Sequence, residues 1–314
     1  MNLHRESFLC IALSTVLLVG EVTGLRAKPT GATVRSADAS MLARSKEDKP
    51  WRVMKKGDAI EENDLILGMP GAKIATKAVE MKLLSDLNNA SPYPILESAI
   101  RVHRNNKVDL DLTLERGRVD LVNRKKKGAA TVHLRFYDQR WDLTLESPGT
   151  RVALEYFGRW PRGSNFKVKL KKGEKHEPTL YLVIVALRGS LIRSCPDCEY
   201  ELKAPPGPAL LAWDNISGRD DRAQKLNKLP AWVDAKPKTE EAIQRKKALE
   251  ELRQTVLKQG IVASLEKLVD SEKPYLRRLG IIGAAATDNL QLVVSTLLKG
   301  KHPDAWDHAV VAIR

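Results

Sequence analysis

Apolar and polar residues alternate with a period of two through much of the chain between residues 51 and 216. The runs over 108–114, 132–136, 141–145 and 152–156 each place an apolar residue at every second position. Strict alternation buries one face of a β-strand and exposes the other. Turn residues separate such runs at intervals of about 8–12 residues, a spacing typical of all-β domains. The pattern predicts an antiparallel β sandwich or roll.

Some positions in this region carry further information. The run 181–187, YLVIVAL, is almost continuously apolar, which is typical of a strand buried on both faces. The alternation turns Asp109, Asp111 and His133 outward. We therefore expect these three side chains to be solvated charges rather than acid–base groups.

The apolar period becomes that of an α-helix from Thr239 onward. Thr239 is followed by two glutamates and is a suitable N-cap, and Gly260 is a suitable C-cap for the first helix. Further helices are predicted over 261–269, 275–286 and 290–299.

A polar stretch over 217–238, which contains Pro230 and Pro237, lies between the two patterns and is predicted to be a linker. The predicted fold class is α+β in separate domains. An antiparallel all-β sandwich or roll over 51–216 is followed by an α-helical region over 239–314.

Two helical segments resemble each other. The segment that begins at Pro274 aligns with the segment that begins at Pro303, 29 residues later. Small residues, which allow helices to pack closely, fall at equivalent positions in the two segments: Gly280 with Ala309, and Gly283 with Ala312. The pattern resembles the first helix of HEAT-type repeats. The chain stops inside the second copy, which leaves two alternatives: the helical region is an incomplete array, or the last helix packs back on its neighbour.

The N-terminus has the order of a secretory signal peptide. A short basic start is followed by an apolar run over 7–20 and by small residues, which gives a predicted signal peptide over 1–27. An apolar run of 14 residues is short for a bilayer span of about 20. The alternative is an uncleaved signal anchor, which is the only membrane attachment we expect. The polar segment 28–50 is predicted to be a flexible leader. The mature protein is then periplasmic or attached to the cell envelope.

The chain is basic, with 53 Lys and Arg against 39 Asp and Glu and a formal net charge of +14. Such a charge favours nucleic acid or another acidic partner. The densest clusters lie next to Gly128 and Gly173 in predicted turns, and no nucleic-acid-binding motif accompanies them. Export also separates the protein from nucleic acid, which is therefore not an expected partner. An anionic polysaccharide or lipid is the acidic ligand that this charge leaves open.

Cys195 and Cys198 form a Cys-Pro-Asp-Cys motif between two alternating runs. This pattern predicts a β-hairpin with the two cysteines facing each other across the turn. In an exported protein they could form a disulfide. Free thiols, a redox pair and a metal site are the alternatives, although zinc needs two more ligands and only His176 is near. We expect no cofactor.

Trp160 is the candidate ligand contact, because Arg159 and Arg162 flank it between predicted strands. An exposed tryptophan on a β sandwich can stack on a sugar ring. Trp141 and Trp213, in contrast, are expected to fill the core.

The sequence contains none of the common catalytic motifs. There is no Gly-x-Ser-x-Gly, His-Glu-x-x-His, P-loop or dinucleotide fingerprint. We therefore expect a protein that is not an enzyme.

Three short motifs resemble the FecR-type periplasmic domain over about residues 51–155. They are the opening with Asp58, Ile60, Asp64 and Ile66, the strand with Gly117 and Val119, and the strand with Gly149, Thr150 and Val152. The chain is most similar to the exported FecR-domain proteins of planctomycete-type bacteria. The resemblance implies a β-rich envelope domain that senses or relays a signal by protein contact and has no catalytic residues. About six residues precede the apolar run, so the cytoplasmic anti-sigma segment has no counterpart and direct sigma-factor regulation is not expected.

These observations together predict an exported, non-enzymatic envelope protein. It would act as a protein-interaction, signal-relay or scaffold module with an envelope protein as its partner. The alternative is a cell-surface β-sandwich protein that binds carbohydrate.

Overall fold

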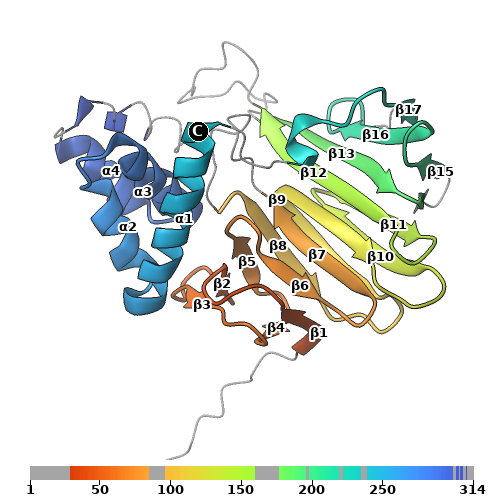
Figure 1. Cartoon of the computed structure of the whole chain (residues 1–314), viewed down its shortest axis with the longest axis horizontal. Helices are drawn as coiled ribbons and strands as arrows, with labels where there is room; N and C mark the ends of the chain where they lie inside the picture. The colour runs from red at the N-terminus through yellow and green to blue at the C-terminus, as the bar shows by residue number, and fades with distance from the viewer. Residues whose placement is uncertain are drawn as a thin grey trace, which may run out of the picture.

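A computed structural model describes most of the chain. The residues that it describes are 29–84, 96–159, 177–195, 198–218, 222–234 and 239–299, together with 302, 303, 305, 306 and 309. Two packed β-sheets are followed by a set of α-helices at one end of the sheets (Figure 1). The expected order of a β region followed by a helical region is confirmed. The predicted signal peptide, 1–27, lies outside the described residues.

The strands form two sheets, here called sheet A and sheet B. In spatial order, sheet A contains β4 (Ala59–Glu61), β1 (Pro29–Val34), β6 (Lys73–Ala75), β7 (Val79–Leu84), the second half of β9 (Leu110–Asn123), β12 (Arg151–Arg159), β13 (Thr179–Arg188), β16 (Pro208–Asp214) and β17 (Gln224–Lys225). Sheet B contains β3 (Arg52–Val53), β2 (Met41–Arg44), β5 (Leu65–Gly68), β8 (Ser98–His103), the first half of β9, β10 (Ala130–Phe136), β11 (Gln139–Leu145), β14 (Ser190–Cys195) and β15 (Cys198–Lys203). Within these sheets the paired strands run antiparallel, except for the parallel pair β9 and β10.

Strand β9 belongs to both sheets and changes from one to the other at Gly117. Before Gly117 it pairs with β8 and β10, and from Gly117 onward it pairs with β7 and β12. Gly117 has a φ of +89°, and a Cβ atom there would lie 2.6 Å from the Cα atom of Ser98. The Ser98 hydroxyl accepts the Arg118 N–H at 3.0 Å and lies 2.6 Å from the Leu84 carbonyl oxygen. This close approach requires glycine at position 117.

The core lies between the two sheets and is centred on aromatic rings. Phe136 packs edge-on against Trp141, Trp213 and Tyr156, with centroid distances of 4.9, 5.1 and 5.7 Å. All four side chains are buried. Trp141 and Trp213 therefore fill the core, as the alternating pattern predicts.

The prediction that residues 28–50 form a flexible leader is wrong. Its described residues contain β1 and β2, and Val34, Met41 and Leu42 are fully buried. The two strands are short and separated by polar residues, so their apolar pattern is too brief to identify from sequence. They are ordered by strands that follow later in the sequence, because β1 pairs with β4 and β6 and β2 pairs with β3 and β5.

The predicted linker, 217–238, also contains packed structure. It includes β17 and a 3₁₀ turn, η1 (Ala231–Asp234). Trp232 and Val233 of this turn are buried on the outer face of sheet A against Ala153 and Val185. This contact covers the second face of β13, so the prediction of a strand buried on both faces is confirmed at its centre.

Four α-helices follow among the described residues: α1 (Glu240–Gln259), α2 (Ile261–Val269), α3 (Pro274–Ala286) and α4 (Leu290–Lys299). Thr239 caps α1, because its hydroxyl accepts the Ala242 N–H at 3.1 Å. Gly260 ends α1 with a φ of +80°. Both caps agree with the sequence prediction.

The small residues aligned in the two similar helical segments are buried wherever the structure describes them. A Cβ atom on Gly280 would lie 2.7 Å from the backbone nitrogen of Val269, so α3 packs directly on the end of α2. Ala309 is fully buried in a cluster that includes Val293. Ala312 lies outside the described residues.

The helical region and sheet B share one apolar cluster. Leu42, Leu67 and Ala99, on the outer face of sheet B, pack together with Leu252 and Val256 of α1. The end of α3 adds polar contacts to this interface. Arg44 pairs with Asp288 and lies 4.4 Å above the Trp51 ring, and the Trp51 indole donates to the Thr287 carbonyl at 3.0 Å. The helices are therefore anchored to the sandwich by a continuous core.

Replacing Gly117 with alanine should destabilise the fold strongly. The added methyl group meets backbone atoms at a positive φ, and we expect a loss of about 3 kcal/mol or more in the free energy of unfolding. Gly57→Ala is the matched control, because Gly57 has a φ of +93° but open space around its Cβ position. It should cost about 1–2 kcal/mol. Urea unfolding measures both values, and equal losses would argue against the close approach at Gly117.

The shared interface predicts that the helices and sheets unfold together. Leu252→Ala should lower the free energy of unfolding by about 2–5 kcal/mol, because it leaves a cavity between α1 and sheet B. Leu257→Ala, on the same helix but 38% exposed, should cost much less. Helical circular dichroism and tryptophan fluorescence should follow one denaturation curve. Two separate transitions would contradict a shared core.

Candidate functional site

Of the predicted sugar-contact residues, only Arg159 lies in the described part of the chain. It ends β12, and its guanidinium lies 5.1 Å from the centroid of the Phe157 ring. Trp160 and Arg162 lie outside the described residues. Trp141 and Trp213 are 2% and 3% exposed, so neither presents a ring face for a ligand.

The outer face of sheet B carries a buried polar cluster rather than the solvated charges expected at Asp109 and Asp111. Asp111 is 2% exposed and accepts hydrogen bonds from two nitrogens of Arg135, at 2.8 and 2.9 Å, and from Asn105 at 2.9 Å. Asp109 pairs with Lys125 at 2.7 Å. Alternation correctly predicted that Asp109 and Asp111 lie on the outer face of the sheet. Long side chains from neighbouring strands and loops cover that face, so the two carboxylates are not solvated.

Burial and hydrogen bonding act in opposite directions on Asp111. Burial alone would raise its pKa, but the hydrogen bonds from Arg135 and Asn105 outweigh that effect and hold the pKa of Asp111 below its ordinary value. The carboxylate is therefore ionised and saturated with donors. This arrangement stabilises a charge and is not suited to accepting a proton in catalysis.

The histidines of this face are also held by protein partners. His103 lies 3.0 Å from Asn63 Oδ1 and 2.7 Å from Thr113 Oγ1. Burial, together with the charge of Arg135, lowers the pKa of His103. His133 is largely buried and lies 3.2 Å from Asp142, which corrects the expectation that it is solvated. Within the described ranges, no three His, Cys, Asp or Glu side chains are grouped so as to hold a metal ion.

Sheet A has its own buried ion pairs. Arg118 is 7% exposed and binds Glu97 at 3.0 Å and Glu155 at 2.6 Å, below Trp232. Asp120 is paired with Arg151 at 2.6 Å. Burial raises the pKa of Asp120, against the opposing effect of Arg151. These pairs fasten β9 to β8 and β12, so they serve the fold.

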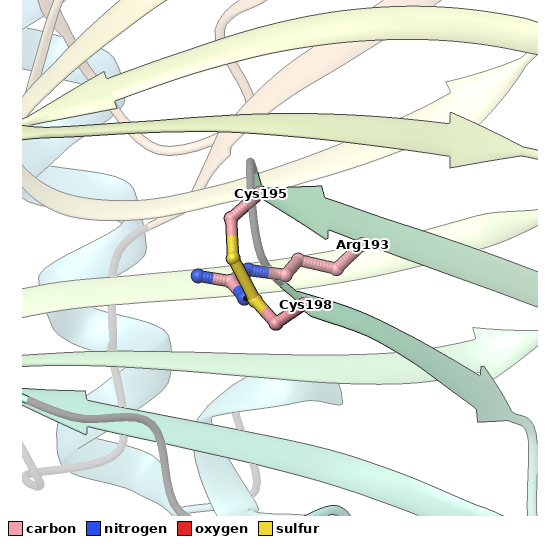
Figure 2. The surroundings of a disulfide bond; sticks show 3 residues. All are labelled: Arg193, Cys195 and Cys198. Carbon is pink, nitrogen blue, oxygen red and sulfur yellow. Dashed lines mark hydrogen bonds between the residues drawn. A yellow bond between two sulfur atoms is a disulfide. The ribbon is translucent and has the colours of Figure 1, made fainter.

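The β14–β15 hairpin holds a disulfide between Cys195 and Cys198 (Figure 2). The Cα atoms are 5.1 Å apart, and the two residues are direct partners across the strands. Arg193 contacts the Cys198 sulfur, although this side chain did not stand out in the sequence. The sequence does hold a pattern that could have identified Arg193. It lies two residues from Cys195 on one strand, so the two side chains share a face of the hairpin.

The helical region exposes an apolar stripe along α4. Leu290, Val294 and Leu298 follow one another at intervals of four residues and are 54%, 44% and 83% exposed. Val293 on the same helix is fully buried. Trp306, 58% exposed, adds a large aromatic side chain beyond the helix. The sequence predicts α4, but most of its residues are apolar, so only the neighbouring helices reveal which face is covered.

Comparison with protein-family models, curated proteins and solved structures gave no match. None of the described helices is both long and apolar enough to span a membrane.

The low pKa of Asp111 predicts a pH-dependent contribution to stability. A depressed carboxyl pKa gives stabilisation that is present at neutral pH and is lost as the pH falls through the folded-state pKa. Asp111→Asn should therefore lower the free energy of unfolding by about 1.5–3 kcal/mol at pH 7. The difference from wild type should shrink below about pH 4, near the unfolded-state pKa.

Urea unfolding of both proteins between pH 7 and pH 3 measures this difference. Asp142→Asn is the control, since the Asp142 side chain is 66% exposed. A pH-independent gap between wild type and Asp111→Asn would show that the loss comes from packing and not from the ionised carboxylate.

Proposed function

We propose that this chain is an exported, non-enzymatic envelope protein that binds another protein through the apolar face of α4. The observation that carries the proposal is the exposed stripe of Leu290, Val294 and Leu298, followed in the chain by the exposed Trp306. Residues spaced by four on a helix form the row that an opposing helix covers when it packs. Covering such side chains gains about 25 cal/mol per Å² of apolar surface removed from water.

The position of α4 suits this role. The helix packs against α3, while α1 and the end of α3 contact the sandwich. Figure 1 accordingly places α4 on the side of the helical region that faces away from the sheets. The sandwich thus serves as a rigid support that presents the stripe to a partner.

The chemistry of the surface favours one kind of partner, an amphipathic helix with acidic residues beside its apolar face. The apolar row would pack on the stripe. The chain carries a formal net charge of +14. An acidic partner would be attracted to this positive field at long range and oriented by it on contact.

Further support for an envelope location comes from two features. The N-terminal sequence has the order of a signal peptide, and a disulfide joins Cys195 and Cys198. Disulfides persist in oxidising compartments outside the cytosol. The FecR-like motifs over 51–155 add support for a role in contact-based sensing, signal relay or scaffolding.

Capture from a cross-linked envelope extract tests the proposal. The full-length protein is the bait, alongside Leu298→Asp and the control Ile216→Asp, whose site on the β region is 75% exposed. A charge in the stripe should reduce capture of a specific protein at least about tenfold, because a charge cannot be buried without a partner. Ile216→Asp should capture it as wild type does. The partner is then identified by mass spectrometry, and its affinity for each variant is measured by calorimetry.

Equal capture by all three proteins would overturn the assignment to α4. The same experiment also tests the alternative function, carbohydrate binding. Retention on cell-wall polysaccharide that weakens with Trp160→Ala, without a specific protein partner, would replace protein binding with carbohydrate binding.

A further inference from the structure

The Cys195–Cys198 disulfide adds little to the stability of the hairpin that contains it. Five other residue pairs, from Ser190–Lys203 to Ser194–Glu199, already set the register of β14 and β15. A disulfide that closes a ring of only four residues restricts the unfolded chain less than one that closes a long loop, so its stabilisation lies at the low end for disulfides. Both cysteines are also partly exposed at the end of the hairpin. A bond that is accessible and weakly stabilising suits a reducible pair better than a permanent cross-link.

A buried cation lies against one of the two sulfur atoms. Arg193 is 2% exposed, and its guanidinium contacts the sulfur of Cys198 (Figure 2). The guanidinium is held over the Trp141 ring at 3.9 Å and lies 5.5 Å from the Tyr200 ring. Packing between two aromatic rings fixes its position, so the charge stays beside Cys198 in either redox state.

Three described acidic residues beside the hairpin lie on the face opposite Cys198. Along β15, Glu199 and Glu201 are exposed and alternate with Cys198 and Tyr200. On the adjoining strand, Asp142 is opposite Ser194 and likewise faces outward, toward His133. On the inner face, the guanidinium of Arg193 places a positive charge against the Cys198 sulfur. An arginine is protonated at all physiological pH values, so its effect on a thiolate is always favourable.

We propose that the Cys195–Cys198 disulfide is a thiol–disulfide exchange site for a dithiol reductant, with Arg193 stabilising Cys198 as the leaving thiolate. The inference does not depend on the α4 face. It assigns a redox-responsive site to the β region, and the chemical class of its partner is a protein or small molecule with two neighbouring thiols.

The exchange proceeds in two displacements. A thiolate of the reductant attacks the Cys195 sulfur, the protein S–S bond breaks, and Cys198 leaves as a thiolate beside Arg193. The second thiolate of the reductant then attacks the reductant sulfur in the mixed disulfide, and Cys195 leaves and takes up a proton. The dithiol loses two electrons and becomes a disulfide, while the protein disulfide gains them. Of the two protons released by the dithiol, one goes to Cys195 and the other to solvent.

Thiolate titration tests the assignment. The full-length protein carrying Cys10→Ser contains only the two thiols of the hairpin. In this background, Cys195→Ser isolates Cys198 and Cys198→Ser isolates Cys195. Ultraviolet absorbance of the thiolate against pH should give Cys198 a pKa at least about one unit below the ordinary 8.5, and Cys195 a pKa near that value. Arg193→Gln added to Cys195→Ser should remove the difference.

The comparison of the two single-cysteine proteins needs no substitution of Arg193, so it stands even if Arg193→Gln fails to fold. A second measurement uses the unmodified cysteine pair with dithiothreitol as the reductant, followed by alkylation and mass spectrometry. Both cysteines should become alkylated while the far-ultraviolet circular dichroism stays native. Equal pKa values for the two thiols, or a disulfide that resists reduction until the protein unfolds, would overturn the proposal and identify a structural cross-link.

Discussion

A single close approach of two backbones, at Gly117, allows one strand to serve both sheets. Because β9 pairs with β8 and β10 before this residue and with β7 and β12 after it, the two layers are covalently and geometrically joined at that point. Any side chain would collide with the backbone at Ser98. The spacing and orientation of the two sheets, and hence the aromatic core between them, depend on this contact.

The buried charges of the sandwich fall into two groups that differ in what they contact. Asp111 is saturated by donors from Arg135 and Asn105, and Arg118 lies between two carboxylates. Each group is satisfied by partners that the fold supplies, as buried charges require. Arg193 also contacts a different kind of group, because its guanidinium lies over the Trp141 ring and against a sulfur of the disulfide, a bond that can be broken chemically. That contrast separates a redox-responsive position from the ion pairs that support the sheets.

The helices and the sandwich form one physical unit although they are separate in sequence. Leu252 of α1 and Leu42 of sheet B belong to the same buried cluster, and Trp51 donates to the end of α3. The β region thereby orients α4, whose stripe points away from the shared core. In the proposed function, the sandwich fixes the position of a binding helix and also carries a redox-responsive hairpin.

The sequence alone determined the features that depend on local periodicity and local chemistry. Alternation identified the main strands and the core positions of Trp141 and Trp213, and the residues Thr239 and Gly260 marked the ends of α1. The alternating runs on either side of Cys-Pro-Asp-Cys identified the hairpin. Other features depend on how the elements pack against one another and became visible only in the fold. They are the pairing that orders β1 and β2, the cover over Asp111, the place of Arg193 beside Cys198, and the exposed side of α4. A side chain is buried only when a second surface covers it, and the periodic pattern of a strand or helix describes only the element's own surface.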